Sequence, residues 1–395
     1  MPQQAFDTVI VRFGGEIGIK ALWTRKQYER RLTSNIKAAL KHHAIQCSAF
    51  VKKAGRLYIK TDRAAEATEK LSQIFGVSSS SPAIETSSQL DDILTTSAEL
   101  AGSQFKLGKS FAVRCRRVGT HLYTSQDVCV KVGERINASL PDLKLHVDLT
   151  RPEQTLQVEV REEKAYLFTN TVKGVGGLPL GTQPKLVCLL KGDVQSTVAC
   201  WMTMKRGCPP VLVHFGEPSL IQRRSNAEQA VALAQKLMEW NIGFPRKLHV
   251  IENSSPFQRL TQTSPSELVS LVHKRLMFRI AQRIAEAIGA EGIVTGDSLE
   301  NDAKHAVHAI NLHDEAVRGF PIYRPLLGFD AAVIAEMAVM VGLKEAAPRR
   351  KKNRAKVKQV KVSQIKLEDV RRIENKLNIE MLVGDAVKSL RVLKI

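Results

Sequence analysis

Residues 186–215, LVCLLKGDVQSTVACWMTMKRGCPPVLVHF, place a polar loop and a helical stretch between the apolar runs LVCLL and VLVHF. Apolar strands that alternate with helices are typical of a parallel sheet covered by helices on both faces. The alternation continues with the apolar runs KLHVIE and GIVTG and with helical patterns at 195–206, 225–240 and 266–288. The sequence therefore predicts an α/β domain whose ligands bind at the carboxyl ends of the strands.

Two further α/β modules precede this domain. The first 80 residues follow the order strand, helix, strand, strand, helix, strand, which is that of a ferredoxin-like unit. Residues 88–172 hold two helical patterns, near 89–102 and 125–140, and the strand patterns SFAVRCR, HVDLT, TLQVEVR and KAYLFTN. The glycine-rich stretch 173–185 breaks the periodicity and is predicted to be a linker or a loop.

The composition limits the class of protein. A chain of 395 residues that is 44% hydrophobic is long enough for two or three ordinary cores. It has no apolar run long enough to span a membrane, and its N-terminus lacks a signal-peptide pattern. The six cysteines form no CxxC pair, so no disulfide scaffold or metal site is indicated. We expect a cytoplasmic protein with no membrane partner.

The net charge of +20 indicates a polyanionic partner. The excess of lysine and arginine lies in residues 1–180 and 344–395, whereas the segment between them is nearly neutral. This distribution favours nucleic acid bound at both ends of the chain. A basic surface that is merely solvated is the alternative.

Several motifs occur in the order found in one known family. The opening RFGGEIGIKALWTRKQYERRL is similar to the start of the tRNA 4-thiouridine synthetases, and TSQDVCVKVGERI, GVGGLPLGTQ, VTGDSL, FPIYRPLLGFD and LEDVRRIENKLNIEMLVGDAV resemble later segments of that family. The resemblance implies a ferredoxin-like domain (1–80), a THUMP RNA-binding domain (81–172), a glycine-rich connector (173–185) and a PP-loop ATP pyrophosphatase domain (186–345). A basic segment and a helical tail (346–395) follow, and no rhodanese domain is present. Active members adenylate uridine 8 of tRNA before sulfur replaces the oxygen.

The resemblance and the charge pattern together predict an RNA-binding surface. Cations near the predicted strand 110–116 suit phosphate contacts, and the low aromatic content of 5% argues against a stacking platform for single strands. We therefore expect a folded duplex RNA, namely tRNA or another structured RNA, recognised by shape. The candidate residues are Lys20, Arg25, Lys106, Lys109, Arg114, Arg116, Arg117, Lys173, Gly176, Gly177, Arg349, Arg350, Lys351, Lys352 and Arg354. A solvated strand edge for the three arginines and a flexible linker for the glycines remain open.

The nucleotide-binding pattern is altered. Family members carry SGGxDS after the first strand of the PP-loop domain, where glycine amides and hydroxyls cradle phosphates at a helix N-terminus. Residues 191–196 of this chain read KGDVQS, so Lys191, Asp193 and Gln195 replace a serine, a glycine and an aspartate. Asp193 adds a carboxylate where an anion has to bind. Two roles are open for Lys191: a point charge for a phosphate, or a pair with Asp193. The vestigial nucleotide-binding residues are Lys191, Gly192, Ser196, Gly296, Asp297 and Ser298.

The sulfur-handling pattern is also missing. Short family members commonly carry CxxC before a KR-x-M helix, whereas Ser270 and His273 stand at those positions here. Neither side chain can relay a persulfide. A replacement metal site at His273, His305 and His308 is not favoured, because no third ligand is indicated for the pair at 305 and 308. We therefore expect no catalytic residues, no metal and no cofactor.

The sequence favours a non-catalytic, RNA-binding relative of the 4-thiouridine synthetases. The first alternative is an active ATP-dependent tRNA sulfurtransferase with an altered loop, Mg²⁺ and an external sulfur donor. The second is a scaffold that binds protein through its C-terminal helix. A homodimer or a ribonucleoprotein partner is compatible with each of them.

Overall fold

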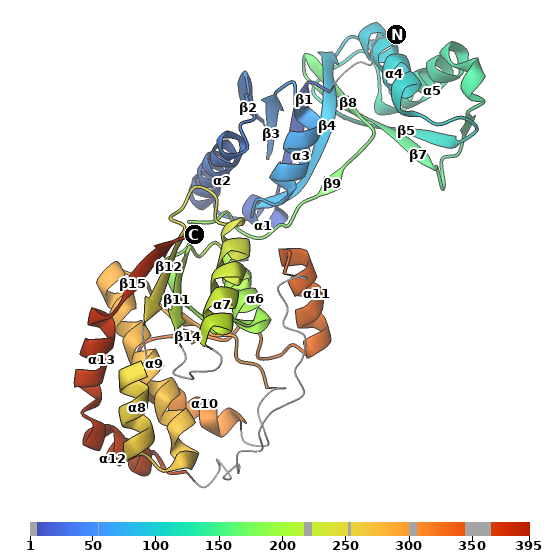
Figure 1. Cartoon of the computed structure of the whole chain (residues 1–395). Coiled ribbons are helices and arrows are strands. Elements are labelled where there is room, and N and C mark those ends of the chain that lie inside the picture. Colours follow the sequence, from blue (N-terminus) through green and yellow to red (C-terminus); the bar gives the residue numbers. More distant parts are fainter. Residues whose placement is uncertain (1–5, 54, 217–222, 252–253, 300–305, 344–364) are drawn as a thin grey trace. The chain divides into compact units, whose positions relative to one another are not determined.

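The computed structural model describes residues 6–53, 55–216, 223–251, 254–299, 306–343 and 365–395. The chain divides into two compact units, one up to Leu178 and one from Pro179, which we describe separately (Figure 1). No helix in these described ranges is long and apolar enough to cross a membrane.

Unit 1 begins with the predicted ferredoxin-like unit. Strand β1 lies centrally and pairs antiparallel with β3 and β4, and β2 pairs with β3. Helices α2 and α3 pack against this part of the sheet and bury Leu32, Ile36 and Leu71. The elements are β1 (Thr8–Phe13), α1 (Gly15–Gly18), α2 (Leu22–His42), β2 (Ala49–Lys53), β3 (Arg56–Lys60), α3 (Ala64–Ser72) and β4 (Val77–Ser87).

The second module of unit 1 continues the same sheet. Strand β4 pairs with β1 over its first half and with β8 over its second half, so the nine strands form one sheet. The domain boundary expected between residues 80 and 81 therefore falls inside β4. The elements are α4 (Leu90–Gln104), β5 (Ser110–Val118), α5 (Ser125–Ser139), η1 (Pro141–Leu143), β6 (His146–Val147), β7 (Gln154–Arg161), β8 (Lys164–Phe168) and β9 (Val172–Lys173).

The glycine-rich stretch after β9 is packed against the ferredoxin-like part. The backbone N–H of Gly174 donates to the carbonyl of Ser78, and that of Gly176 donates to the carbonyl of Val77. A Cβ atom at Gly174 would overlap the Val77 carbonyl, so only glycine fits there. The start of this stretch is therefore a packed connector.

Unit 2 contains the predicted parallel sheet in the order β14-β13-β10-β11-β12-β15. Alternate residues of β10 face opposite layers: Val187 and Leu189 join the core around α9, and Cys188 lies next to Cys200 of α6. The elements are β10 (Leu186–Leu190), α6 (Val194–Lys205), β11 (Pro210–Phe215), α7 (Arg223–Met238), β12 (Lys247–Ile251), α8 (Ser254–Thr263), α9 (Ser266–Ile288), β13 (Ile293–Val294), α10 (Ala306–Asp314), η2 (Glu315–Val317), β14 (Ile322–Tyr323) and α11 (Ala331–Val341).

The C-terminal tail differs from the single helix expected from the sequence. It forms α12 (Leu367–Leu377), α13 (Ile379–Lys388) and β15 (Arg391–Lys394). Asn378, with φ of 50°, separates the two helices, and β15 pairs antiparallel with β12 at the sheet edge. The apolar face of α12 packs on the core around α9, so it is not available for a protein partner as the scaffold alternative requires.

Candidate functional site

The turn between β10 and α6 lies at the carboxyl end of the central strand, as predicted. Gly192 takes a φ of 77°, a left-handed conformation that favours glycine. Asp193 is the N-cap of α6, and its Oδ1 accepts from the Ser196 backbone N–H at 2.8 Å and from Ser196 Oγ at 2.6 Å. A carboxylate of the chain itself therefore occupies the helix N-terminus where phosphate oxygens bind in PP-loop proteins.

The pairing of Lys191 with Asp193, one of the two roles open for Lys191 from the sequence, is wrong. Lys191 Nζ lies 3.4 Å from Asp297 Oδ1, whereas Asp193 is engaged in capping α6. Capping satisfies the otherwise unpaired Ser196 N–H, and this local bond holds the Asp193 carboxylate at the helix end.

Asp297 is the centre of the second loop. It is 7% exposed and accepts from Thr295 Oγ1 at 2.8 Å, and Lys274 Nζ lies 2.9 Å from its Oδ2. Arg324 Nε also lies 3.4 Å from Oδ2. Burial raises the pKa of Asp297, but the charges of Lys274 and Lys191 outweigh burial and hold the pKa of this carboxyl well below its usual range.

Gly296 brings this second loop against α6. A Cβ atom at Gly296 would lie 2.5 Å from the Ser196 backbone nitrogen, so the loop can approach the helix only with glycine at this position. Ser196 and Ser298 are both buried. The six vestigial nucleotide-binding residues predicted from sequence thus lie in two adjacent loops and the first turn of α6, and their roles in nucleotide binding stay predictions.

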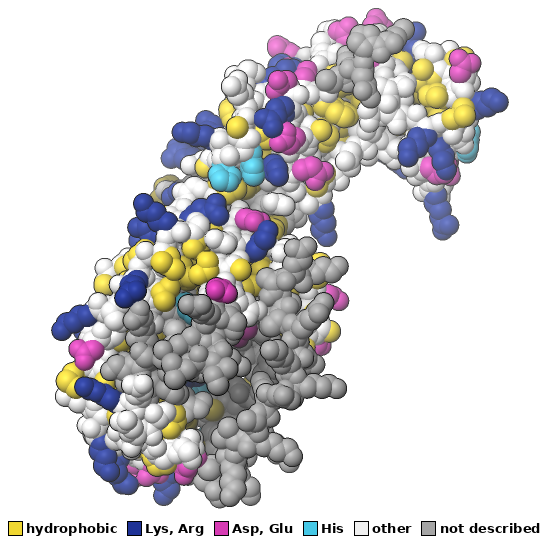
Figure 2. Space-filling model, in the orientation of Figure 1, with side chains coloured by type: hydrophobic (Ala, Val, Ile, Leu, Met, Phe, Trp, Pro, Cys, Tyr) yellow, Lys and Arg dark blue, Asp and Glu magenta, His cyan; other side chains and the backbone are white. Residues whose placement is uncertain are grey.

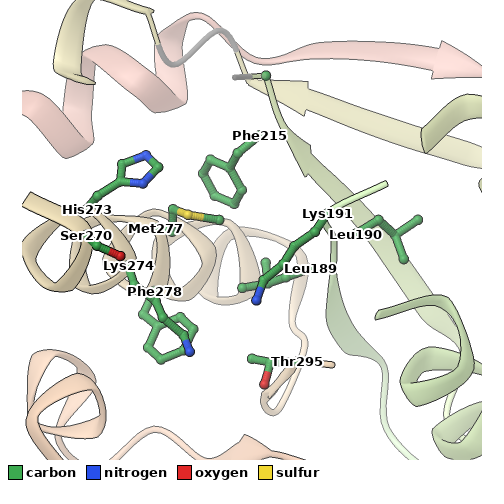
Figure 3. Close-up of a pocket in the computed structure, with 11 residues that line it drawn as sticks. Leu189, Leu190, Lys191, Phe215, Ser270, His273, Lys274, Met277, Phe278 and Thr295 are labelled. Carbon is green, nitrogen blue, oxygen red and sulfur yellow. The ribbon is translucent and has the colours of Figure 1, made fainter. Parts of the chain in front are cut away.

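Two adjoining cavities open at these loops. The first, of about 230 Å³, is lined by apolar side chains of β10, β11 and α9, with Lys191 and Thr295 at one side (Figure 3). The second, of about 590 Å³, is lined by Asp193, Gln195, Asp297 and His313, among others. Open cavities therefore lie next to the loops, and Asp193 places negative charge in the lining of the second one.

Ser270 and His273, which replace the two sulfur positions of the family, both line the first cavity and project from α9 (Figure 3). Burial lowers the pKa of His273 to about 4. His308 Nε2 lies 3.2 Å from the carbonyl oxygen of Ile365, and His305 lies outside the described residues. Among the residues described, no three His, Cys, Asp or Glu side chains are grouped to hold a metal ion.

Acidification is expected to destabilise unit 2 through its buried histidines. Burial, followed by the charges of Lys274 and Arg324, lowers the pKa of His313 from 6.5 to about 3. The unfolded state therefore takes up this proton first, so the contribution of His313 to stability declines as pH falls from about 6.5 towards 3, by at most about 1.4 kcal/mol per pH unit. Urea unfolding of His313→Leu between pH 7.5 and 4.5 should show a shallower decline than wild type. His146→Leu, at an exposed site of unit 1, is the control, and an equal decline in His313→Leu contradicts the assignment.

Lys274 and Arg324 are site residues that the sequence analysis missed. Both lie in segments that carry the family resemblance, the KR-x-M helix and FPIYRPLLGFD. Pattern alone did not place them near Asp297, because α9 and the loop after β14 converge only in the folded domain.

The three candidate arginines of β5 lie on two faces of the sheet. Arg114 and Arg116 are exposed and share one face, since side chains alternate along a strand. Arg117 lies on the opposite face, the face of the buried Phe111 and Val113, and donates to the carbonyl of Gly119 at 3.0 Å. Arg114 donates to the carbonyl of Leu149 at 2.6 Å. Only Arg114 and Arg116 can therefore contact one phosphate backbone together.

The other RNA-binding candidates are dispersed over unit 1. Lys109 pairs with Glu153 at 2.6 Å, and Arg25 pairs with Glu29 at 2.9 Å. Lys173 lies in β9 beside β4, which is separated from β5 by β8 and β7. Gly177, like Gly176, has a positive φ, whereas Lys20 and Lys106 are exposed. The candidates of the basic run lie outside the described residues: Arg349, Arg350, Lys351, Lys352 and Arg354.

Charge is distributed over the visible face in the same dispersed manner. Figure 2 shows lysine and arginine side chains over both units, with acidic side chains among them and no single basic patch. Several cations of unit 1 are neutralised by ion pairs, including Lys53 with Glu162 and Lys60 with Asp7. The total number of lysines and arginines therefore overstates the number of cations available for phosphates.

The fold and the loops define a two-unit protein in which a ferredoxin-like and α/β module precedes a PP-loop-like domain. Family models match in the same order: the ThiI ferredoxin-like domain at 8–81, the THUMP domain at 87–170 and Thiamine biosynthesis protein (ThiI) at 181–379. The chain belongs to this ThiI family.

Relatives named "Probable tRNA sulfurtransferase" align over nearly the whole chain. The protein of Methanosarcina acetivorans is 35% identical over 98% of this chain and 94% of its own, and that of Saccharolobus islandicus strain M.14.25 is 32% identical over 94% and 96%. A crystal structure of a 4-thiouridine synthetase–RNA complex with bound ATP matches with a TM-score of 0.83 at 26% identity, covering 98% of this chain and 99% of that chain. PH1313 from Pyrococcus horikoshii matches with a TM-score of 0.68 at 27% identity, over 85% of this chain and all of that one.

Proposed function

We propose that this protein is a cytoplasmic member of the ThiI family that binds tRNA or another structured RNA and does not thiolate it. The observation that carries the proposal is the capping of α6 by Asp193. A triphosphate at this helix end would meet a fixed carboxylate, and two unit charges about 4 Å apart near a protein surface interact by about 4 kcal/mol. The Asp193 carboxylate therefore disfavours binding of a nucleoside triphosphate at this loop.

The second support comes from the positions of the sulfur relay. Ser270 and His273 face the cavity, and neither can carry a persulfide. Phosphate binding and sulfur transfer need different groups at different places, so the two losses are independent of each other. Compensation by one neighbouring residue would restore only half of the reaction.

RNA binding is supported by the THUMP match and by the RNA complex of the related synthetase. Lys20, Lys106, Arg114 and Arg116 are exposed cations in unit 1 that suit phosphate contacts. Shape recognition of a folded RNA requires few base contacts, which agrees with cations dispersed over a surface.

The alternative is an active ATP-dependent tRNA sulfurtransferase that uses an external sulfur donor. It is favoured by the names of the relatives, the left-handed turn at Gly192 and the cavity beside the loops. Lys191 and Lys274 could also exchange Asp297 for a phosphate. The Asp193 carboxylate at the N-terminus of α6 argues against this alternative.

One set of measurements separates the two functions. Calorimetry of the full chain should show tRNA binding with a log–log salt slope of about −0.7 to −0.9 per phosphate contact, and no ATP binding at micromolar concentrations. Mass spectrometry of tRNA incubated with the protein, ATP, Mg²⁺ and a sulfur donor should show no 4-thiouridine. Thiolated uridine in that sample establishes the sulfurtransferase instead, and a chain that ignores tRNA at low salt contradicts both functions.

A further inference from the structure

The corner between α1 and α2 exposes three large apolar side chains. Ile19, Leu22 and Trp23 are 85%, 75% and 72% exposed. Single exposed apolar residues are common on protein surfaces, but three within five positions form a cluster that marks an interaction site more often than chance. We call these three residues the Trp23 corner.

The local fold explains why the Trp23 corner is not buried. The buried stripe of α2 begins at Glu29 and continues through Leu32 and Ile36, so the first turn of the helix makes no contribution to the core. Ile19 caps the four-residue helix α1 and is likewise turned out of the core. Packing of unit 1 thus requires no tryptophan here, although burying such a side chain would be favourable.

Cations surround the corner. Lys26 and Arg30 are exposed and follow Trp23 by three and seven residues, which places all three on one face of α2. Lys20 is exposed beside Ile19. In the described part of the chain, none of these three cations forms an ion pair, whereas Arg25 and Lys52 on the neighbouring face are both paired with Glu29. Glu16 is the acidic residue close in sequence to the corner.

An aromatic face next to unpaired cations matches the chemistry of an unstacked nucleotide. A base stacks on an indole, and phosphates on either side of the base pair with lysine and arginine. Bases inside a duplex are already stacked on each other, so only an unpaired nucleotide of the RNA can use the indole. A membrane surface suits the corner less well, because α1 and one turn of α2 offer a short apolar face compared with a membrane-binding helix.

We propose that Trp23 stacks on an unpaired nucleotide of the bound RNA, with Lys20, Lys26 and Arg30 contacting the flanking phosphates. This inference rests on the proposed RNA-binding function and adds a stacking contact, which the low aromatic content had argued against. One exposed tryptophan in a suitable place is enough for a single stacked base.

Intrinsic fluorescence tests the contact directly. The chain has three tryptophans, and Trp201 and Trp240 lie in unit 2, where they pack edge to face with ring centroids 5.4 Å apart. Trp201 is 2% exposed and Trp240 is half-buried, whereas Trp23 is 72% exposed, so quenching by iodide should report mainly on Trp23. A tRNA transcript should quench the iodide-accessible emission and protect it from iodide. Trp23→Phe should lack this signal while retaining most of the RNA affinity.

Affinity measurements separate stacking from phosphate contacts. Trp23→Ala should weaken tRNA binding roughly 5- to 100-fold with an unchanged salt slope. Lys26→Ala should reduce the slope by about 0.7 to 0.9. The effect of Trp23→Ala should vanish for a blunt RNA duplex without unpaired nucleotides. Leu107→Ala, which truncates a 64% exposed leucine elsewhere in unit 1, is the matched control and should bind as wild type.

Failure of the inference differs from failure of the proposed function. If wild type binds tRNA and Trp23→Ala binds it equally well, the stacking contact is wrong and RNA binding stands. If wild type does not bind tRNA, the proposed function fails as well. Trp23 protected from iodide without RNA, in a manner that rises with protein concentration and accompanies dimers in sedimentation, overturns the inference in favour of contact with a second copy of the chain.

Discussion

Arg275→Met is expected to lower the unfolding temperature of unit 2 by roughly 6 to 20 °C. The Arg275 side chain is fully buried on α9, and its guanidinium lies 2.7 Å from Glu374 of α12 and 2.8 Å from Glu315 of η2. It also donates to the carbonyl of Leu312. Removing one partner from a buried ion pair costs about 3 to 5 kcal/mol, because the remaining charge stays desolvated.

Burial of Glu374 explains why Arg275→Met is expected to cost so much stability. It is 3% exposed, and after loss of Arg275 it would keep only the contact with Arg279 at 3.1 Å among those described. Hydrogen exchange resolved by peptides should show lost protection in α9 and α12 and unchanged protection in β1 to β4. The C-terminal helices are thus expected to behave as part of the domain.

Two variants make this prediction falsifiable. Arg283→Ala removes a partner of Glu380 in a pair whose side chains are 58% and 63% exposed, so its effect should be below about 1 kcal/mol. The double variant Arg275→Met/Glu374→Leu replaces the pair by apolar groups and should recover much of the lost stability. Equal unfolding temperatures for Arg275→Met and Arg283→Ala would show that the buried ion pair does not stabilise the packing of the C-terminal helices on α9.

Removing the charge of Asp193 is expected to raise ATP affinity roughly fivefold to a thousandfold. The range reflects the interaction of two charges about 4 Å apart, from about 1 kcal/mol in water to about 4 kcal/mol near a protein surface. Asp193→Asn is the sharpest variant, because asparagine caps a helix about as well as aspartate and leaves α6 intact. The triple variant Lys191→Ser/Asp193→Gly/Gln195→Asp should bind ATP at least as well, and neither variant should form 4-thiouridine, because Ser270 and His273 are unchanged.

Asp330→Asn provides the matched control. Asp330 caps α11 and accepts from the Val333 N–H at 3.0 Å, so it repeats the geometry of Asp193 at another helix of unit 2. Calorimetry should show no gain in ATP affinity for this variant. If Asp193→Asn also binds ATP no better than wild type, the carboxylate is not what excludes the nucleotide.

The sequence by itself determined the fold class, the order of the elements and the family. Apolar runs such as LVCLL and VLVHF identify buried parallel strands, because both faces of such strands are covered. Ordered motifs carried the resemblance that the family models confirm. The absence of glycine at position 193 and of cysteine at both sulfur positions is likewise read directly from the sequence.

Only the tertiary structure decided how these residues are partnered. Lys191 pairs with Asp297, which lies 106 positions away. Asp193 instead caps α6, because its carboxylate accepts from the Ser196 N–H, which has no acceptor within the helix. Residues far apart in sequence meet only after the sheet has formed, and pattern carries no information on such contacts. Strand β15 was missed for the same reason: a four-residue segment becomes a strand by pairing with β12. Exposure of Trp23 also depends on which face of α2 packs on the sheet: Trp23 shares a face with the exposed Lys26 and Arg30, whereas Leu32 and Ile36 are buried on another face.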